Sequence, residues 1–129
     1  MWPIFGSQIG NVGLTHMGSI ESRDLFPGAL EMMILQIIRR RPAHGYALVQ
    51  HIGHRSNDLL QVEEGSLYPA LQRMLKAGLV KARWQVSPTG RRVRTYELTP
   101  RGAKHLDRER SKFERMLEGI YLVLSLVKS

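Results

Sequence analysis

The chain has 129 residues, enough for one domain or for one small domain with an appended element. Nineteen Lys and Arg against eleven Asp and Glu give a formal charge of +8, which favours polyanionic partners such as DNA, RNA or an anionic membrane surface. Cysteine is absent, which excludes disulfides, thiolate metal ligands and a cysteine nucleophile. No apolar run approaches the roughly eighteen residues of a membrane span, so we expect a cytoplasmic protein with no membrane partner.

The first segment, residues 1–22, has neither helical nor strand periodicity. It mixes Gly, Ser, Asn, Gln and Thr with scattered apolar residues, and it lacks the cationic start and long apolar centre of a secretory signal. We expect a flexible N-terminal tail. The alternative is that Trp2 and Phe5 hold this tail along a partner subunit.

The next segment, FPGALEMMILQIIRRR, predicts a helix that begins near Pro27. It is apolar on nearly every side, and a helix of that kind is buried on every side. In so small a chain this predicts that the helix, through Leu30 and Ile34, lies between its own domain and a second copy of the protein. We interpret the arginines at 39–41 as a favourable C-terminal cap rather than as nucleic-acid contacts.

The segments AHGYALVQHIGHRS and EEGSLYPALQRMLKAGLV predict a short helix, an irregular turn and an amphipathic helix. This is the layout of a helix-turn-helix. We expect Gly53 to break the first helix. The second should begin near Ser66, because Pro69 is tolerated only in a first turn, and it should end at Gly78 in the left-handed conformation.

The second of these predicted helices is amphipathic: one face is apolar and should be buried, and the other suits contact with an anionic partner. At about 100° per residue, the apolar residues from Leu67 to Leu75 fall on one arc. The opposite arc carries hydroxyl, phenol, amide and cationic groups and no carboxylate. Its residues are Ser66, Tyr68, Pro69, Gln72, Arg73 and Lys76.

Residues 80–98 alternate between apolar and polar side chains, as in a two-stranded ribbon. The apolar residues from Val80 to Val86 predict a half-buried strand, residues 87–90 have the composition of a turn, and the second strand returns through Tyr96. The fold does not require a charged tip, since Asn, Ser or Thr would serve there equally well. The tip nevertheless carries Arg91, Arg92 and Arg94.

Residues 99–129 predict a long helix that Thr99 and Pro100 begin. Its apolar residues recur alternately every three and four positions, a heptad pattern broken only by Arg110. The helix would run on the order of 40 Å, too long to pack wholly against so small a domain, so we expect a homodimer; packing within one chain is the alternative. The predicted interface consists of Leu30, Ile34, Leu106, Phe113, Leu117, Ile120 and Leu124.

These elements predict an α+β, mostly α fold: a tail at 1–22, a winged helix-turn-helix DNA-binding domain at 23–98 and a C-terminal dimerisation helix at 99–129. The chain closely resembles the PadR family of bacterial transcriptional regulators. The resemblance rests on LFPGALEMMIL, HGYAL, VEEGSLYPALQRMLKAGLV and RRVRTYELTPRG, from Leu25 to Gly102. The single C-terminal helix is similar to the short branch of the family, which dimerises through it.

The resemblance implies a transcriptional regulator, and we expect a repressor that binds a near-palindromic operator on double-stranded DNA as a homodimer. Gln72 and Arg73 have the donor patterns that read base edges. Tyr68 suits a phosphate contact, with packing on its own helix as an equal alternative, and the arginine-tipped ribbon would lie along the minor groove. The predicted DNA-binding residues are His44, Tyr46, Ser66, Tyr68, Pro69, Gln72, Arg73, Lys76, Arg91, Arg92 and Arg94.

Other functions have weaker support. His51 and His54 are the only His pair at helical ligand spacing, and no HExxH motif, phosphate-binding glycine loop or serine elbow occurs. We therefore expect no enzyme, no metal and no other cofactor. An RNA-binding or protein-bridging winged helix without operator specificity is the remaining alternative. The resemblance also implies a small hydrophobic or aromatic effector, which Trp84, Phe113 and Met116 are candidates to contact, although core packing is the preferred interpretation of each.

Overall fold

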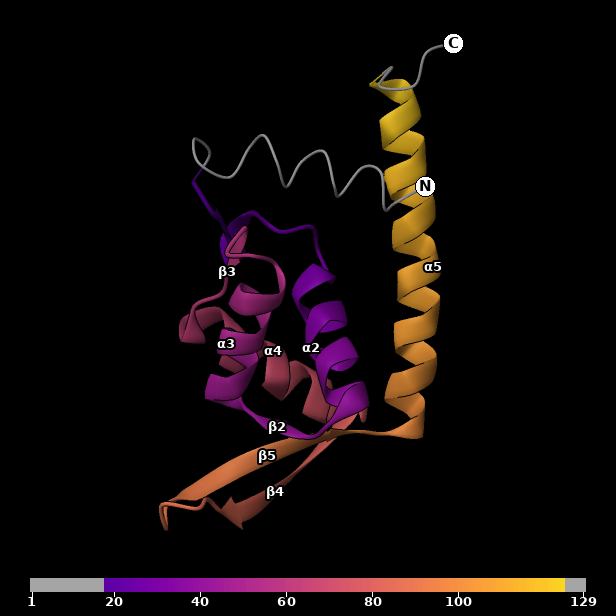
Figure 1. Ribbon diagram of the computed structural model, residues 1–129. Coiled ribbons are helices and arrows are strands. Elements are labelled where there is room, and N and C mark those ends of the chain that lie inside the picture. The colour runs from indigo at the N-terminus through magenta and orange to yellow at the C-terminus, as the bar shows by residue number, and fades with distance from the viewer. Residues whose placement is uncertain (1–17, 125–129) are drawn as a thin grey trace.

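The computed structural model describes residues 18–124, so residues 1–17 of the expected tail and residues 125–129 of the expected last helix lie outside the described part. The architecture is mostly helical with small sheets, as the sequence predicts (Figure 1). In chain order the elements are β1 (Ile20–Glu21), the 3-10 turn η1 (Ser22–Asp24), α2 (Ala29–Arg40), β2 (Ala43–His44), α3 (Gly45–Arg55), β3 (Leu60–Gln61), α4 (Glu64–Lys76), β4 (Val80–Val86), β5 (Arg92–Leu98) and α5 (Pro100–Val123).

Helices α2, α3 and α4 form a bundle, and the other elements extend from it (Figure 1). β4 and β5 pair antiparallel with each other, and β2 adds to β5, so the small sheet has the order β2-β5-β4. This hairpin, the wing, projects from one end of the bundle. α5 stands beside α2 and continues past the opposite end of the bundle.

The end of the predicted tail is part of the fold. β1 pairs in parallel with β3, with Ile20 opposite Leu60, and the amide of Ile20 donates to the carbonyl of Leu59 at 2.7 Å. The hydroxyl of Ser22 donates to that of Ser66 on α4 at 3.0 Å. Residues 20–22, which belong to the predicted tail, thus contact the domain. A two-residue strand is too short to show a period in the sequence.

α2 lies at the centre of the hydrophobic core. Ile34 and Leu35 have no exposed surface, and the helix packs against α3, α4, α5 and β5 of its own chain. Leu106 of α5 is also fully buried in this core. Leu30, Ile34 and Leu106 were predicted at the dimer interface, but the same chain covers all three, so a partner is not needed to explain their apolar character.

α3 differs from the prediction at its C-terminal end. The helix continues through Gly53, the expected break, and ends at Arg55. The chain reverses just afterwards, where Asn57 and Asp58 adopt left-handed backbone angles with φ of 53° and 62°. Asn and Asp tolerate this region better than most residues, so these two residues turn the chain and Gly53 does not.

α4 begins at Glu64, two residues before the expected start, which places Pro69 in the second turn. Pro69 has no N–H to bond the carbonyl of Gly65 four residues earlier. Both residues are exposed, so water can solvate that carbonyl, and this explains why the proline is tolerated. The helix ends as predicted, because Gly78 has φ of 74° and the amides of residues 78 and 79 close a Schellman motif.

The start of α5 is in direct contact with the turn between α4 and β4. The hydroxyl of Thr99 accepts a hydrogen bond from the amide of Gly102 at 3.0 Å, which confirms the predicted N-cap. The same hydroxyl donates to the carbonyl of Gly78 at 2.7 Å. A Cβ added to Gly102 would lie 2.0 Å from the carbonyl oxygen of Leu79, so only glycine permits this approach.

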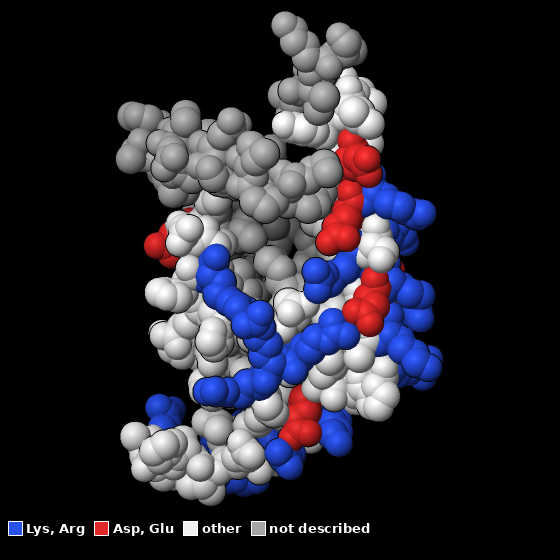
Figure 2. Space-filling view, turned by 45° about the vertical axis from the view of Figure 1, so that its right-hand side comes forward, with Lys and Arg blue, Asp and Glu red and all other residues white. Residues whose placement is uncertain are grey.

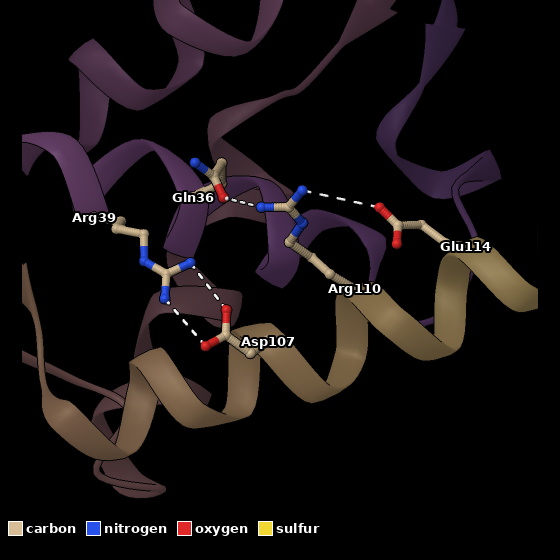
Figure 3. Close-up of polar contacts among 5 residues, drawn as sticks. All are labelled: Gln36, Arg39, Asp107, Arg110 and Glu114. Atoms are coloured by element: carbon tan, nitrogen blue, oxygen red, sulfur yellow. Dashed lines mark hydrogen bonds and ion pairs between the residues drawn. The ribbon is translucent and has the colours of Figure 1, made fainter. Parts of the chain in front are cut away.

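Polar contacts hold the first half of α5 against α2 (Figure 3). Arg39 donates two hydrogen bonds, of 3.1 and 3.3 Å, to the carboxylate of Asp107. Arg110 donates to Gln36 at 3.1 Å and lies 3.9 Å from Glu114. The hydrogen bond from Arg39 lowers the pKa of Asp107. The stabilisation by this pair is therefore complete above the ordinary pKa of an aspartate and is lost only as the pH falls through the lowered value.

The apolar stripe of α5 continues past the elements that cover it. Phe113 meets Phe26 edge to face, with 6.0 Å between the ring centroids, and Leu117 is half-buried. Further along, Ile120 is 39% exposed and Leu124 is 63% exposed. The stripe is thus partly uncovered in the distal half of the helix. No helix within residues 18–124 has the length and apolar character needed to span a bilayer.

Candidate nucleic-acid interface

Three parts of the predicted site meet at the start of α3. His44 of β2 pairs with Thr95 of β5, so α3 begins directly beside the wing. The ring of Tyr68 from α4 occupies the space where Gly45 has no side chain: a Cβ there would lie 2.6 Å from the phenol oxygen. The HGYAL and LYPAL sequences therefore form one contact, and they join α3, α4 and the wing into a continuous surface.

The two predicted residues at the start of α3 have different environments. Nδ1 of His44 accepts a hydrogen bond from the amide of Ala47 at 3.4 Å, so His44 caps the helix. A neutral imidazole that accepts at Nδ1 carries its proton on Nε2, which remains a donor. Tyr46 is 56% exposed. His44 is thus fixed in place by the helix that it begins, whereas Tyr46 projects toward solvent.

Tyr68 packs across onto α3 rather than along its own helix, and it remains 42% exposed. Burial of the phenol raises its pKa, with further increases from the nearby charges of Glu64 and Tyr96. The phenol is therefore fully protonated near neutral pH and can donate a hydrogen bond to an anion. Packing on its own helix, the predicted alternative, therefore does not describe this position, and the phosphate contact stays a prediction.

The contact between Gly45 and Tyr68 can be tested by a double-mutant cycle. We expect G45A to lower the free energy of unfolding by about 1–3 kcal/mol, because the added methyl group displaces the ring. In the Y68A background the same substitution should cost much less, since the ring is gone. Urea denaturation of the four proteins measures the coupling. If the losses in free energy of unfolding caused by G45A and Y68A are additive in the double variant, the two residues do not contact each other.

The predicted residues of α4 fall into two groups. Tyr68, Gln72 and Lys76, spaced four residues apart, are exposed on the outer face of the helix. The other three, Ser66, Pro69 and Arg73, line one hollow together with η1 and the start of α2. Ser66 accepts the hydrogen bond from Ser22 of η1, and Arg73 contacts Glu31 of α2.

Arg73 is held by a carboxylate that lies outside α4. Its Nε and Nη2 donate to Oε2 of Glu31 on α2 at 3.3 and 2.8 Å. The outer arc of α4 lacks a carboxylate, as the sequence shows, but the neighbouring helix supplies one. One edge of the guanidinium is thus occupied, and the remaining N–H groups are available to an outside acceptor.

The wing has one face on which positive charge is compensated. Lys81 and Arg83 form ion pairs with the carboxylate of Glu97 on the adjacent strand, and the distance from Lys81 to Glu97 is 3.9 Å. The side chain of Glu97 is mostly buried, at 17% exposure. This face therefore contributes less net charge than its two cations suggest.

The opposite face of the wing is cationic without compensation. Trp84 lies opposite Arg94 in the strand register, and the guanidinium carbons of Arg92 and Arg94 lie 4.7 and 6.0 Å from the centre of its indole ring. Between residues 18 and 124, no carboxylate forms an ion pair with Arg91, Arg92 or Arg94. The three predicted arginines therefore retain their full charge at the wing.

Trp84 is the residue that sequence reasoning misplaced. The alternation predicted half-buried Trp84 and Val86, but they are 57% and 71% exposed, because the wing extends beyond the bundle. Nor does Trp84 share a pocket with Phe113: the pocket at Phe113 is lined by Arg110, Phe113, Glu114 and Leu117. The sequence alone could have predicted that Trp84 and Arg94 share a face. The turn at 87–90 sets the register of the two strands, and in that register the two residues lie opposite each other.

Charge on α5 is mixed in sign. Figure 2 shows Lys and Arg side chains gathered on the face that includes α5, with Asp and Glu among them along the helix. Two of these acidic groups, Glu109 and Glu114, lie 3.9 Å from basic neighbours on the same helix. Among the described residues, no three His, Asp or Glu side chains gather as potential metal ligands.

Comparison with known proteins identifies the family. The model of the transcriptional regulator PadR-like family matches residues 34–108, more than half of the chain. A transcriptional regulator from Clostridium thermocellum has a similar structure, with a TM-score of 0.70 and 26% identity over 78% of this chain and 95% of that one. For a PadR-like transcriptional regulator from Bacillus cereus the values are 0.66 and 28%, over 76% and 93% of the two chains.

A third structure shows a likeness of fold alone. PadR of Bacillus subtilis, in complex with operator DNA, gives a TM-score of 0.56 at 22% identity, and the match covers 61% of this chain and 46% of that one. The family match spans the second half of α2, the whole helix-turn-helix, the whole wing and the first turns of α5. The chain therefore belongs to the PadR-like family of transcriptional regulators.

Proposed function

We propose that this protein is a homodimeric repressor that binds a near-palindromic operator and acts in the cytoplasm by binding DNA rather than by catalysis. The observation that carries the proposal is the continuous surface formed by the start of α3, the outer face of α4 and the uncompensated wing arginines. A helix with an exposed polar face beside a cationic hairpin suits a DNA major groove and the adjacent minor groove.

On this surface each exposed group has a distinct role. The amide of Gln72 carries the donor and acceptor pair that reads adenine, and Arg73 can reach guanine with the N–H groups that Glu31 leaves free. Tyr68 and Lys76 donate to phosphates and fix the register of the helix. Nε2 of His44 and the hydroxyl of Tyr46 add backbone contacts at the start of α3, and Pro69 packs against the groove wall.

The uncovered distal stripe of α5 supports the homodimer. Two copies joined through it would present two α4 helices to half-sites about one helical turn apart. Release by a small hydrophobic or aromatic effector is part of the same proposal. A pocket of about 280 Å³ beside Phe113 and Leu117 lies where a partner helix would close it.

Selection of bound sequences from a random duplex pool tests the function directly. We expect an inverted repeat whose half-site centres are about 10 base pairs apart, bound more tightly than unselected duplex or RNA of the same length. A selected pool without a common sequence, or RNA that competes as well as duplex DNA, would instead support the RNA-binding or protein-bridging alternative.

The wing contribution can be measured with R91A/R92A. We expect weaker binding to all duplex sequences alike and a smaller dependence of affinity on salt, by about one unit of log–log slope for each phosphate that the variant no longer neutralises. The matched control is K104A/R115A, which removes the same charge from exposed positions on α5. If the two double variants weaken binding equally, the wing is not part of the binding surface.

A further inference from the structure

We propose that Trp84 is a positioning residue of the wing: its indole holds the guanidinium groups of Arg92 and Arg94 in place for DNA. This inference rests on the proposed DNA binding, and it assigns a role in that binding to an uncharged residue. The residue is not explained by the core, because 57% of its surface is exposed. Nor does it complete the ion pairs of the wing, since those lie on the other face.

The contacts of Trp84 come from the strand pairing. Arg94 is its direct cross-strand partner, and Arg92 lies diagonally across, opposite Val86. Cross-strand partners of this kind lie close enough for long side chains to touch. The guanidinium carbons lie 4.7 and 6.0 Å from the ring centre, within the range in which a cation is attracted to an aromatic face. One indole thus contacts two of the three wing arginines.

An indole orders an arginine without neutralising it. A carboxylate also orders an arginine, as Glu97 does for Arg83, but it cancels the charge that an anionic partner requires. A guanidinium that stacks with its plane on a ring keeps its N–H groups at the edge, where they can donate to phosphates or base edges. Ordering the side chain before binding lowers the entropy that association costs. Trp84 therefore restrains the side chains of Arg92 and Arg94, and the wing keeps its positive charge.

The first test compares the affinity of W84A and wild type for the selected operator over a range of salt concentrations. We expect about tenfold weaker binding of W84A, because two cation–π interactions are removed, with an unchanged salt slope, because no charge is removed. R92A should lower both the affinity and the slope. The matched control is V86A, which removes the exposed apolar residue directly opposite Arg92 without removing an aromatic ring, and it should bind within about twofold of wild type. W84F should recover part of the affinity.

The second test needs no DNA. Nitrogen-15 relaxation of the arginine side-chain Nε–H groups reports how ordered Arg92 and Arg94 are in the free protein. We expect both groups to be more ordered in wild type than in W84A, whereas Arg91 should not change. Equal mobility in the two proteins overturns the proposal, as does a W84A variant that binds like V86A or loses salt slope like R92A. Ordered arginines in a wild-type protein that binds no duplex would contradict the proposed function instead.

Discussion

Replacing Gly102 with alanine should lower the free energy of unfolding by about 3 kcal/mol. Alanine in a helix normally stabilises a protein by up to about 1 kcal/mol relative to glycine, so the expected sign is the reverse of the usual one. The reason is the 2.0 Å distance between a Cβ at this position and the carbonyl oxygen of Leu79. A backbone atom cannot rotate away as the end of a side chain can.

The displacement would also break the cap of α5. To make room, the first turn must move away from Leu79, which lengthens the bonds of the Thr99 hydroxyl to the amide of Gly102 and to the carbonyl of Gly78. Loss of a cap of this kind costs about 1 kcal/mol. The clash and the loss of the cap therefore both destabilise the protein at the point where α5 joins the winged domain.

Urea denaturation of G102A and G119A makes the comparison within one helix. A Cβ at Gly119 would meet nothing within 4 Å, so G119A should be as stable as wild type or slightly more stable. We expect the G102A midpoint to fall well below both. A G102A midpoint equal to that of G119A would mean that α5 does not approach Leu79 as closely as described.

Placing aspartate at Ile120 should separate the dimer and greatly weaken operator binding. Ile120 lies in the uncovered part of the α5 stripe, where a partner helix would bury it, and an unpaired carboxylate in such an interface is strongly unfavourable. Sedimentation should then give a particle of 14.7 kDa. Because two linked half-sites bind much more tightly than one, we expect operator affinity to fall by a factor on the order of 100 or more.

The control for this variant is Ser111→Asp, which adds the same charge at an exposed position on the opposite side of α5. It should remain a dimer with near-normal affinity. An I120D protein that sediments as a dimer would show that the distal stripe of α5 does not form the interface. In that case the predicted contribution of Leu117 and Leu124 would be wrong as well.

The sequence predicted local structure well where side chains determine the backbone. Thr99 and Pro100 fixed the start of α5, and Gly78 fixed the end of α4, because capping chemistry is local. Pro69 shows the limit of such reasoning. Its preference for a first turn was overcome in an exposed second turn, where solvent can bond the carbonyl that the proline leaves free.

Periodicity indicated which residues are buried, but it did not indicate what buries them. The apolar character of α2 suggested a partner subunit, whereas α3, α4, α5 and β5 of the same chain surround the helix. In β4 the opposite occurred: Trp84 has the spacing of a half-buried residue, but its part of the strand lies past the bundle. How far the body of a domain extends depends on three-dimensional packing, which a one-dimensional pattern does not contain.

The junction between α2 and α5 has a mechanical consequence. Beyond Leu106, much of it consists of exposed polar contacts such as Arg39–Asp107 and Arg110–Gln36 (Figure 3), which contribute little individually and weaken as salt increases. α5 extends about 36 Å at 1.5 Å per residue. In a dimer joined through the far end of α5, a small tilt of the winged domain relative to α5 would therefore displace the two α4 helices by a large distance. The rigidity of the contact between α2 and α5 would then determine how much variation in half-site spacing the dimer tolerates. Because the hydrogen bond from Arg39 lowers the pKa of Asp107, this carboxylate is charged near neutral pH, and the Arg39–Asp107 contact would respond to ionic strength.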